Sequence, residues 1–321
     1  MAGRVLVVGS YNQDLVWEVD ALPAPGETRA GLAFRSGPGG KGFNQAVAAA
    51  RAGANTTFIG ALGDDALAAG ARSIAQSEGI DARVATIADA ATGTAGILVD
   101  ARGRNSIVVA LGANARLSTA HVDAQADAFR DAGVVLAPLE SPLDAVLAAM
   151  RRGRLAGART ILNPAPVHAA LDAAALSDVD LLTPNETEFT ALLSGLAGAS
   201  VDPSTLRHRP DAELAALCAR LPVGAVIVTL GDAGAFIAAG ATGAASTRTA
   251  RLPAAAVRAI DTTGAGDAFN GALAAAWADA PDADPTALLP FAMRFAGLST
   301  ERRGAAAAMP RRAEVIQRFG A

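Results

Sequence analysis

One segment of the sequence combines small residues with a carboxylate in a way that suits phosphate chemistry. Residues 261–267 read DTTGAGD and are followed by the alanine-rich stretch AFNGALAAAWA. We expect a strand that ends near Ala259 and Ile260, then a glycine-rich turn, then a helix that begins at Asp267. Small residues let backbone N–H groups approach an anion, and a helix N-terminus adds partial positive charge. The predicted anion hole consists of the amides of Gly264, Ala265 and Gly266.

Asp267 is the candidate catalytic base. At the lip of the anion hole, its carboxylate would accept the proton of an attacking hydroxyl, because phosphoryl transfer needs chiefly alignment, charge neutralisation and one base. An aspartate at the start of a helix is more commonly an N-cap. The Gly-Ala-Gly turn directly before this aspartate favours catalysis over capping.

A second glycine-rich segment, SGPGGKGFNQ, contains Lys41, the only lysine of the chain. A compact, flexible ammonium differs from the planar fork of arginine, so its retention here indicates a specific need. Gly37, Gly39 and Gly42 match GxGxxG, but no strand leads directly into them, and the residue after the lysine is not the Ser or Thr of a Walker A loop. A loop that presents amides, Lys41 and Asn44 to a polyhydroxylated ligand fits better.

Two further polar side chains follow the first apolar run of the chain. Asn12 and Asp14 alternate with Tyr11 and Gln13, so in an extended segment they share one face. Asp14 would accept hydrogen bonds from two adjacent hydroxyls. Asn and Asp after a strand are also ordinary turn formers, and without the other motifs that interpretation would prevail.

Composition limits the classes of function. The chain has 321 residues, 51% of them hydrophobic, and a net charge of −4, with arginines scattered along it. These features favour a full core and a small-molecule substrate, and they do not support a nucleic-acid or membrane partner. The first apolar run is too short for a signal peptide, so we expect a cytoplasmic protein. Cys218 is expected to be a buried thiol, and the three histidines, His121, His168 and His208, lack zinc-ligand spacing.

The elements needed to position these residues are those of an α/β fold. Short β-rich runs alternate with alanine-rich helical stretches, which predicts a mostly parallel sheet covered by helices. Residues 14–36 and 93–110 interrupt the alternation with strand patterns and turns, the second as a hairpin around ARGRN. We expect them to form a small β-sheet lid, with residues 1–13, 37–92 and 111–321 as the core. A homodimer through the lid would cover its apolar face and exposed edges.

Six segments together resemble ribokinases, within the phosphofructokinase B family of carbohydrate kinases. They are GSYNQD, GGKGFNQAVAAARAGA, NPAP, TPNETE, TLGDAGA and DTTGAGDAFNGAL, in the family's order over nearly the whole chain. DTTGAGD is common to the wider family, whereas Asn12-x-Asp14 with GGKG and Asn44 indicates the ribokinase branch. The resemblance implies a three-layer α/β sandwich with a small β-sheet lid, and phosphorylation of D-ribose by ATP with Mg2+.

The resemblance also implies roles for individual residues. The pentose would be held by Asn12, Asp14, Gly40, Lys41, Asn44, Glu140 and Asp267. ATP would be contacted by Asn185, Thr229, Gly231, Gly234, Gly266 and Met293. Glu188 would organise Mg2+ through water, its alternative role being that of a helix-capping acid. A monovalent cation, usually K+, would be bound by the side chain of Asp261 and the carbonyls of Thr263, Ser299, Arg302 and Gly304.

The sequence departs from the ribokinase pattern at three positions. Phe43 stands where alanine is usual, and it would either narrow the sugar pocket or pack beneath it. Ala308 offers no side-chain oxygen to the cation, and Met293 replaces a polar residue under the adenine. The alternatives are therefore a kinase for deoxyribose, a nucleoside or another sugar, or a sugar-binding regulator that has lost catalysis.

Overall fold

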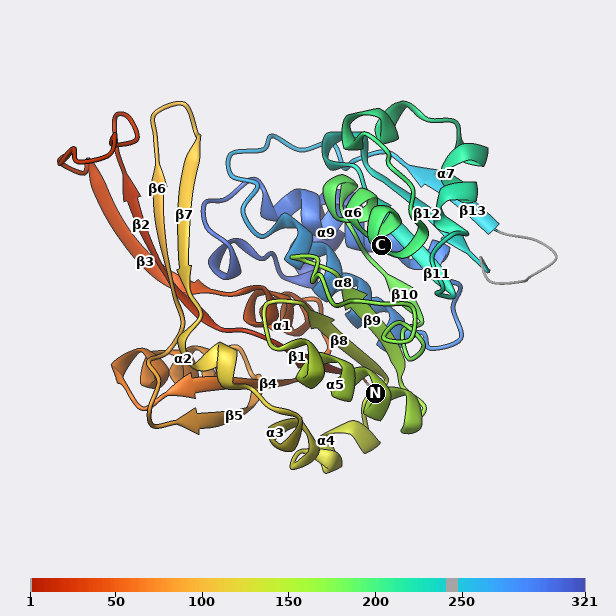
Figure 1. The fold of residues 1–321 in the computed structure, drawn as a ribbon, viewed down its shortest axis with the longest axis horizontal. Coiled ribbons are helices and arrows are strands. Elements are labelled where there is room, and N and C mark those ends of the chain that lie inside the picture. Colours follow the sequence, from red (N-terminus) through yellow and green to blue (C-terminus); the bar gives the residue numbers. More distant parts are fainter. Residues whose placement is uncertain (1, 241–247, 321) are drawn as a thin grey trace.

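The computed structural model describes residues 2–240 and 248–320. Its centre is a nine-stranded sheet in the order β13-β12-β11-β10-β9-β8-β1-β4-β5 (Figure 1). These strands are β1 (Arg4–Val8), β4 (Asn55–Gly63), β5 (Asp81–Ile87), β8 (Val134–Pro138), β9 (Arg159–Asn163), β10 (Leu181–Leu182), β11 (Ala225–Thr229), β12 (Ala235–Ala239) and β13 (Arg248–Leu252). Neighbouring strands are parallel except β11–β12 and β12–β13. The predicted mostly parallel sheet is confirmed.

Helices cover both faces of this sheet because alternate residues of its strands are apolar on opposite sides. Val5 and Val7 of β1 belong to one buried cluster, and Leu6 and Val8 to the other. The first cluster includes residues of α1 (Lys41–Arg51), α2 (Ala66–Ser77), α8 (Ala265–Asp279), α9 (Pro285–Ser299) and α10 (Arg312–Phe319). The second includes residues of α3 (Thr119–Asp123), α4 (Ala126–Arg130), α5 (Leu143–Leu155), α6 (Glu186–Ala197) and α7 (Asp211–Cys218). Two layers of helices therefore enclose the sheet.

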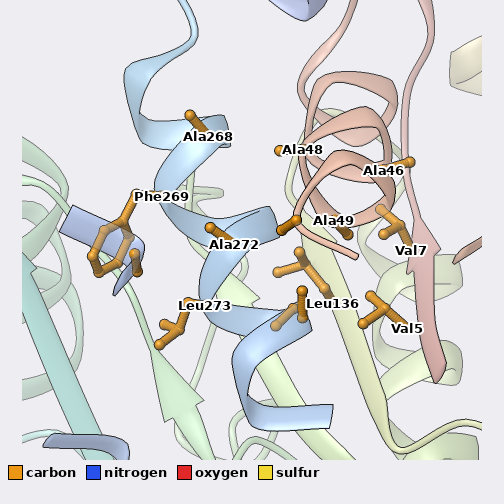
Figure 2. Packing of buried hydrophobic residues seen from close by; sticks show 14 of the residues in the cluster. Val5, Val7, Ala46, Ala48, Ala49, Leu136, Ala268, Phe269, Ala272 and Leu273 are labelled. Atoms are coloured by element: carbon orange, nitrogen blue, oxygen red, sulfur yellow. The ribbon is translucent and has the colours of Figure 1, made fainter. Parts of the chain in front are cut away.

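Small residues let α1 and α8 pack closely side by side on the sheet. Ala48 and Ala49 of α1 lie beside Ala268 and Ala272 of α8 in the first cluster (Figure 2). A methyl group added to Gly271 would come within 2.4 Å of the carbonyl oxygen of Gln45. The close approach brings the first turns of the two helices together, and these turns carry most of the predicted site.

The small sheet projects from the core beside α1 (Figure 1). Its four strands have the order β3-β2-β6-β7 and comprise β2 (Asn12–Glu18), β3 (Ala33–Gly39), β6 (Thr94–Val99) and β7 (Asn105–Ala110). The hairpin expected around ARGRN is the antiparallel pair β6–β7. Strands β2 and β3 extend beyond residues 14–36, so Asn12 is itself a residue of the small sheet.

The order of the strands places a ligand site at one edge of the large sheet. Strand β1 lies between β4 and β8, and the chain proceeds outward from it on both sides. In open parallel sheets, ligands bind outside the carboxyl ends of the strands where the order reverses. Ser10 and Glu140, each two residues beyond the ends of β1 and β8, lie at this point.

One expected element is absent. Residues 253–264 form no helix or strand, so the strand predicted to end near Ala259 and Ile260 is wrong. The amides of Ile260 and Asp261 both donate to the carbonyl of Thr300, just after α9, at 2.7 and 3.0 Å. Local sequence favoured a strand, but the end of α9 satisfies these backbone groups instead.

Two smaller expectations can be compared directly with the structure. Cys218 is fully buried at the end of α7, and burial raises the pKa of its thiol to about 12, so the expected inert thiol is confirmed. Among the residues that the structure describes, no helix is long and apolar enough to cross a membrane.

Candidate active site

Asp267 lies in the first turn of α8 and not at its start. The helix begins at Ala265, and Gly264 is the N-cap with a left-handed φ of 75°, a conformation that favours glycine. The predicted start at Asp267 is therefore wrong by two residues, and so is the alternative that Asp267 caps the helix. Its carboxylate is 6% exposed and accepts hydrogen bonds from Asn44 Nδ2 at 2.9 Å and Gln45 Nε2 at 3.0 Å.

The surroundings of Asp267 suit a base. Burial raises the pKa of its carboxyl, while the charge of Lys41 and the two amide hydrogen bonds act in the opposite direction. The same carboxylate is the main reason that the pKa of Lys41 is raised above its usual value. Asp267 is therefore a buried carboxylate that is more basic than in water and feels the charge of the half-buried Lys41.

The turn before Asp267 leaves backbone N–H groups free for an anion. No described residue accepts a hydrogen bond from the amides of Gly264 or Gly266, whereas the amide of Ala265 donates to the carbonyl of Thr262 at 3.2 Å. A methyl group added to Gly266 would meet no atom within 4 Å. Two of the three predicted amides thus have no hydrogen-bond partner among the described residues, and they lie at the positive end of a fifteen-residue helix.

The first turn of α1 and the end of β8 form the opposite wall. Glu140 Oε2 accepts from the backbone amide of Lys41 at 2.9 Å and from Ser10 Oγ at 2.6 Å. Gly40 is the N-cap of α1, with a φ of 83°. The structure therefore brings Gly40, Lys41, Asn44 and Glu140 into one neighbourhood with Asp267, as the expected sugar site requires.

The lid supplies two more polar groups. Asn12 and Asp14 share one face of β2. Burial, followed by the negative charges of Glu140 and Asp267, raises the pKa of Asp14 to about 7, against the opposing charge of Arg35. Glu140 and Asp267 of the core are therefore close enough to influence Asp14, although Asp14 belongs to the small sheet.

A chain of buried amides behind Asp267 escaped the sequence analysis. Gln45 Nε2 donates to Asn163 Oδ1 at 3.0 Å as well as to Asp267, and Asn163 Nδ2 donates to the carbonyl of Thr183 at 3.0 Å. Thr183 Oγ1 donates to Asn270 Oδ1 at 2.6 Å, and Asn270 Nδ2 donates to the carbonyl of Gly266 at 2.9 Å.

The network links β9 and α1 to the first turn of α8, and it holds the Asp267 carboxylate and the Gly266 backbone in one geometry. Its sequence signals were polar residues inside otherwise apolar elements: Gln45 beside Asn44, Asn163 in NPAP, and Asn270 in an alanine-rich helix.

The predicted nucleotide residues gather at the ends of the next strands. Asn185 forms a parallel bridge with Thr229, and Gly231 and Gly234 bound the short turn that follows β11. Met293, on α9, packs against the first buried cluster. The structure thus brings Asn185 and the glycine turn together, whereas Met293 belongs to the packing of the helix layer.

Glu188 and Asn185 form a reciprocal capping box at the start of α6. Asn185 Oδ1 accepts from the Glu188 amide at 2.9 Å, and Glu188 Oε2 accepts from the Asn185 amide at 2.8 Å. The capping role weighed for Glu188 is therefore real. Burial raises the pKa of its carboxyl, while the hydrogen bond from the Asn185 amide and the charge of Lys41 lower it.

Asp261 ties together two loops beside the anion hole. Its Oδ1 accepts from the amide of Thr263, and its Oδ2 accepts from the amide of Gly304, both at 2.9 Å. Burial works to raise the pKa of this carboxyl, but these hydrogen bonds and the charge of Arg35 lower it. Three of the predicted cation ligands are thus adjacent. The carbonyl of Ser299 accepts from the amide of Arg302 at 3.3 Å.

The side chain at position 43 does not narrow the sugar pocket. Phe43 is 1% exposed and stacks edge to face between Tyr11 and Phe58, with ring centroids 5.1 and 5.5 Å apart. Of the two expectations for Phe43, packing beneath the site is confirmed, because the inner face of α1 directs this side chain to the sheet. Ala308 is also buried and presents no side-chain oxygen.

A buried carboxylate, open helix amides and a lid over an α/β core define a phosphotransferase that acts on a small hydroxyl compound. Comparison with known families agrees: the model of the pfkB family carbohydrate kinases matches residues 2–312. The chain belongs to this family.

Individual proteins of known name are similar over almost the full length. The chain is 34% identical over 322 residues to a ribokinase of Haemophilus influenzae, covering 99% of this chain and 98% of that protein. It is also 34% identical over 307 residues to a deoxyribokinase of Salmonella typhi, covering 95% of each. A structure of Arabidopsis thaliana ribokinase complexed with ribose and ATP matches with a TM-score of 0.82 and 30% identity, covering 99% of this chain and 98% of that chain. The ribokinase-like fold predicted from the sequence is confirmed.

Proposed function

We propose that this chain transfers the terminal phosphoryl group of ATP to the 5-hydroxyl of D-ribose, giving D-ribose 5-phosphate and ADP. The observation that carries the proposal is the position of Asp267, buried beside Lys41 and next to the unoccupied amides of Gly264 and Gly266. The similarity to named ribokinases, one of them solved with ribose and ATP, supports the choice of substrates.

The proposed mechanism uses the residues in the order in which they surround the sugar. Asn12, Asp14, Asn44 and Glu140 bind hydroxyl groups and direct one of them at Asp267. The carboxylate takes the proton as the oxygen attacks phosphorus, and the bond from phosphorus to the ADP oxygen breaks. The amides of Gly264 and Gly266, together with Lys41, stabilise the charge on the transferred group.

Metal ions would assist through the phosphates. Within residues 2–240 and 248–320, no cluster of three His, Cys, Asp or Glu side chains could hold an ion, so Mg2+ would arrive with ATP and keep water ligands. Glu188, whose Oε1 no described residue occupies, would contact one of these waters. The Mg2+ would neutralise phosphate charge. K+ beside Asp261 would extend the positive field of the anion hole, with Thr263, Ser299, Arg302 and Gly304 as carbonyl ligands.

The lid would close over the sugar and exclude water, which otherwise competes for the phosphoryl group. Its sheet exposes an unusual amount of apolar surface, including Trp17, Phe34, Ile107, Val108 and Val109 at 37–74% exposure. A second copy of the chain, packed lid to lid, would cover this surface and both free edge strands. We therefore propose a homodimer.

Deoxyribose is the strongest competing substrate, because a deoxyribokinase is as similar to the chain as a ribokinase is. The two sugars differ by one hydroxyl, and a site that hydrogen-bonds a hydroxyl rejects the analogue that lacks it. Nucleosides and other sugars are further candidates, although the burial of Phe43 removes the main reason to expect them. A silent sugar-binding regulator would not need Asp267 and the open amides.

A coupled ADP-release assay over ribose, 2-deoxyribose, other pentoses and nucleosides tests the proposal. It is run with and without K+. We expect the highest kcat/KM with ribose. A clear preference for 2-deoxyribose or a nucleoside would replace the substrate, and sugar binding in calorimetry without any ADP release would establish the regulator.

A further inference from the structure

The point where the lid joins the core contains a buried asparagine that no predicted role accounts for. Asn114 lies in the short 3-10 helix η1 (Gly112–Arg116), directly after lid strand β7, and is 1% exposed. Its Oδ1 accepts from the backbone amide of Tyr11 at 2.9 Å. Its Nδ2 donates to the carbonyl of Tyr11 at 2.8 Å and to Oδ1 of Asn12 at 2.9 Å. One side chain thus holds both the backbone before Asn12 and the Asn12 side chain.

These bonds determine the orientation of two carboxamides. A backbone N–H can only donate and a carbonyl can only accept, so the two bonds to Tyr11 define which end of Asn114 is oxygen and which is nitrogen. The atom of Asn12 that faces Asn114 Nδ2 must then be its oxygen. No described residue accepts a hydrogen bond from Asn12 Nδ2, so this group is the end of the side chain that remains for a ligand.

The surroundings leave little room for another arrangement. A methyl group added to Gly93, the residue before β6, would lie 2.2 Å from Asn114 Nδ2 and 2.4 Å from Asn12 Oδ1. The carbonyl of Gly93 accepts from the amide of Gln13 at 2.8 Å. The chain passes from core to lid at residues 11–13 and again at residue 93, and it returns to the core after β7. All three segments therefore pack around the Asn114 amide.

We propose that Asn114 is a positioning residue for the sugar: it turns the Asn12 amide so that Nδ2 donates to one hydroxyl oxygen, while Asp14 on the same strand face accepts from hydroxyl protons. This inference rests on the proposed sugar-kinase function and deepens it. The site then presents a donor and an acceptor in a fixed order along β2, and the order depends on a residue that does not touch the substrate. Because the same amide joins the three crossings, the orientation is set where the lid meets the core.

A double-mutant cycle tests the proposal. Asn12→Ala, Asn114→Ala and the double variant are compared with the wild type, using whichever sugar of the substrate panel the wild type phosphorylates best. KM for the sugar, KM for ATP, kcat and the melting temperature are measured for each. Asn105→Ala, which changes an exposed asparagine at the far end of β7, is the matched control.

We expect Asn114→Ala to raise the sugar KM about tenfold or more, because an unoriented amide loses the hydrogen bond to the hydroxyl. KM for ATP should stay within about twofold, and in the Asn12→Ala background the second substitution should change the sugar KM little, as residues acting through one another are not additive. Additive effects on the sugar KM, or an unchanged sugar KM in Asn114→Ala, would overturn the positioning role.

A near-isosteric variant keeps the test decisive if alanine prevents folding. Asn114→Asp retains the acceptor for the Tyr11 amide but cannot donate to Asn12 Oδ1. Its sugar KM should rise, and that rise should disappear in the Asn12→Ala background. A wild type that binds sugars but phosphorylates none would instead contradict the proposed function, and sugar dissociation constants from calorimetry would then replace KM in the same cycle.

Discussion

At the scale of single residues, two aspartates have the main proposed roles: Asp14, on strand β2, binds the sugar, and Asp267, on helix α8, is the base. Asp267 is held by Asn44 and Gln45 and faces Lys41. For Asp14, burial, Glu140 and Asp267 all act against ionisation. The charged forms of both carboxylates are therefore disfavoured by burial, and hydrogen bonds from the hydroxyl groups of a ligand would stabilise them.

Replacing the proposed base separates catalysis from binding. Asp267→Ala removes the proton acceptor but leaves Asn12, Asp14 and Asn44 to bind the sugar. We expect kcat to fall by a factor on the order of 10²–10⁴, the usual contribution of a general base, with the sugar dissociation constant changed much less. ADP release and calorimetry measure the two quantities. Substantial residual turnover would assign the base elsewhere.

Asp14 should make sugar binding dependent on pH. Its pKa of about 7 in the empty site means that it is protonated below neutrality, and a protonated carboxyl accepts fewer hydroxyl hydrogen bonds. We expect the sugar KM to rise as the pH falls below about 7. In Asp14→Asn the KM should be high at all pH values, and this loss of slope separates Asp14 from the other charged groups of the site. An unchanged slope in the variant would assign the titration to another group.

Replacing Asp14 should also stabilise the folded protein at high pH. A carboxyl whose pKa is raised on folding stabilises the folded state while it is protonated, and that stabilisation is lost as the pH rises through about 7. Asp14→Asn carries no charge at position 14. At pH 8, without sugar, its free energy of unfolding should exceed that of the wild type by about 1–3 kcal/mol, and its melting temperature should be higher. The difference should vanish near pH 4. Thermal unfolding at the two pH values measures it.

At the scale of elements, the proposed anion hole depends on the first turn of α8. Gly264 supplies the left-handed cap, while the Cα of Gly266 faces open space. The proposed anion hole consists of backbone amides, which carry no side chain to mutate, so their role has to be tested by blocking access to them.

A methyl group at Gly266 should reduce activity without loss of stability. Alanine is a better helix former than glycine by about 0.5–1 kcal/mol, and no atom of the described residues lies within 4 Å of the methyl group. We expect Gly266→Ala to keep or raise the melting temperature while kcat/KM falls at least about tenfold, because the methyl group occupies the space before the amides.

The matched control is Gly70→Ala in the middle of α2, where a methyl group also meets no atom within 4 Å. It should stabilise the protein to a similar degree and leave kinetics unchanged. Equal activity of both variants would argue against an anion hole at Gly266.

At the scale of the whole molecule, the lid is a small sheet with a large exposed surface. All six residues of β7 are exposed, and a four-stranded sheet without a covering layer is poorly stabilised in water. A partner lid would supply that layer, so closure over the sugar and assembly would be coupled.

A charge on the lid should dissociate the proposed dimer. Val108, 74% exposed in β7, is replaced by aspartate. We expect the wild type to have the mass of a dimer and Val108→Asp that of a monomer in light scattering, with a raised sugar KM because the lid is less ordered. Ser73→Asp, at an exposed position of α2 outside the lid, is the control for added charge. A wild type that is monomeric at all concentrations would exclude the dimer.

The sequence by itself determined the features that depend on neighbouring residues. The alternation of β-rich and alanine-rich runs predicted the covered parallel sheet, the turn at ARGRN predicted the β6–β7 hairpin, and the glycines of DTTGAGD predicted a helix N-terminus with free amides. These features follow from local periodicity and turn chemistry, which are written in a few consecutive residues.

Only the tertiary structure decided how distant residues meet. Asn44 and Asp267 are 223 residues apart, and Asn114 is 102 residues from Asn12. The burial of Phe43, the amides behind Asp267 and the missing strand before Asp261 likewise depend on which elements pack together. Such contacts arise from the packing of α1 against α8 and from the paths between lid and core, and no local pattern encodes them.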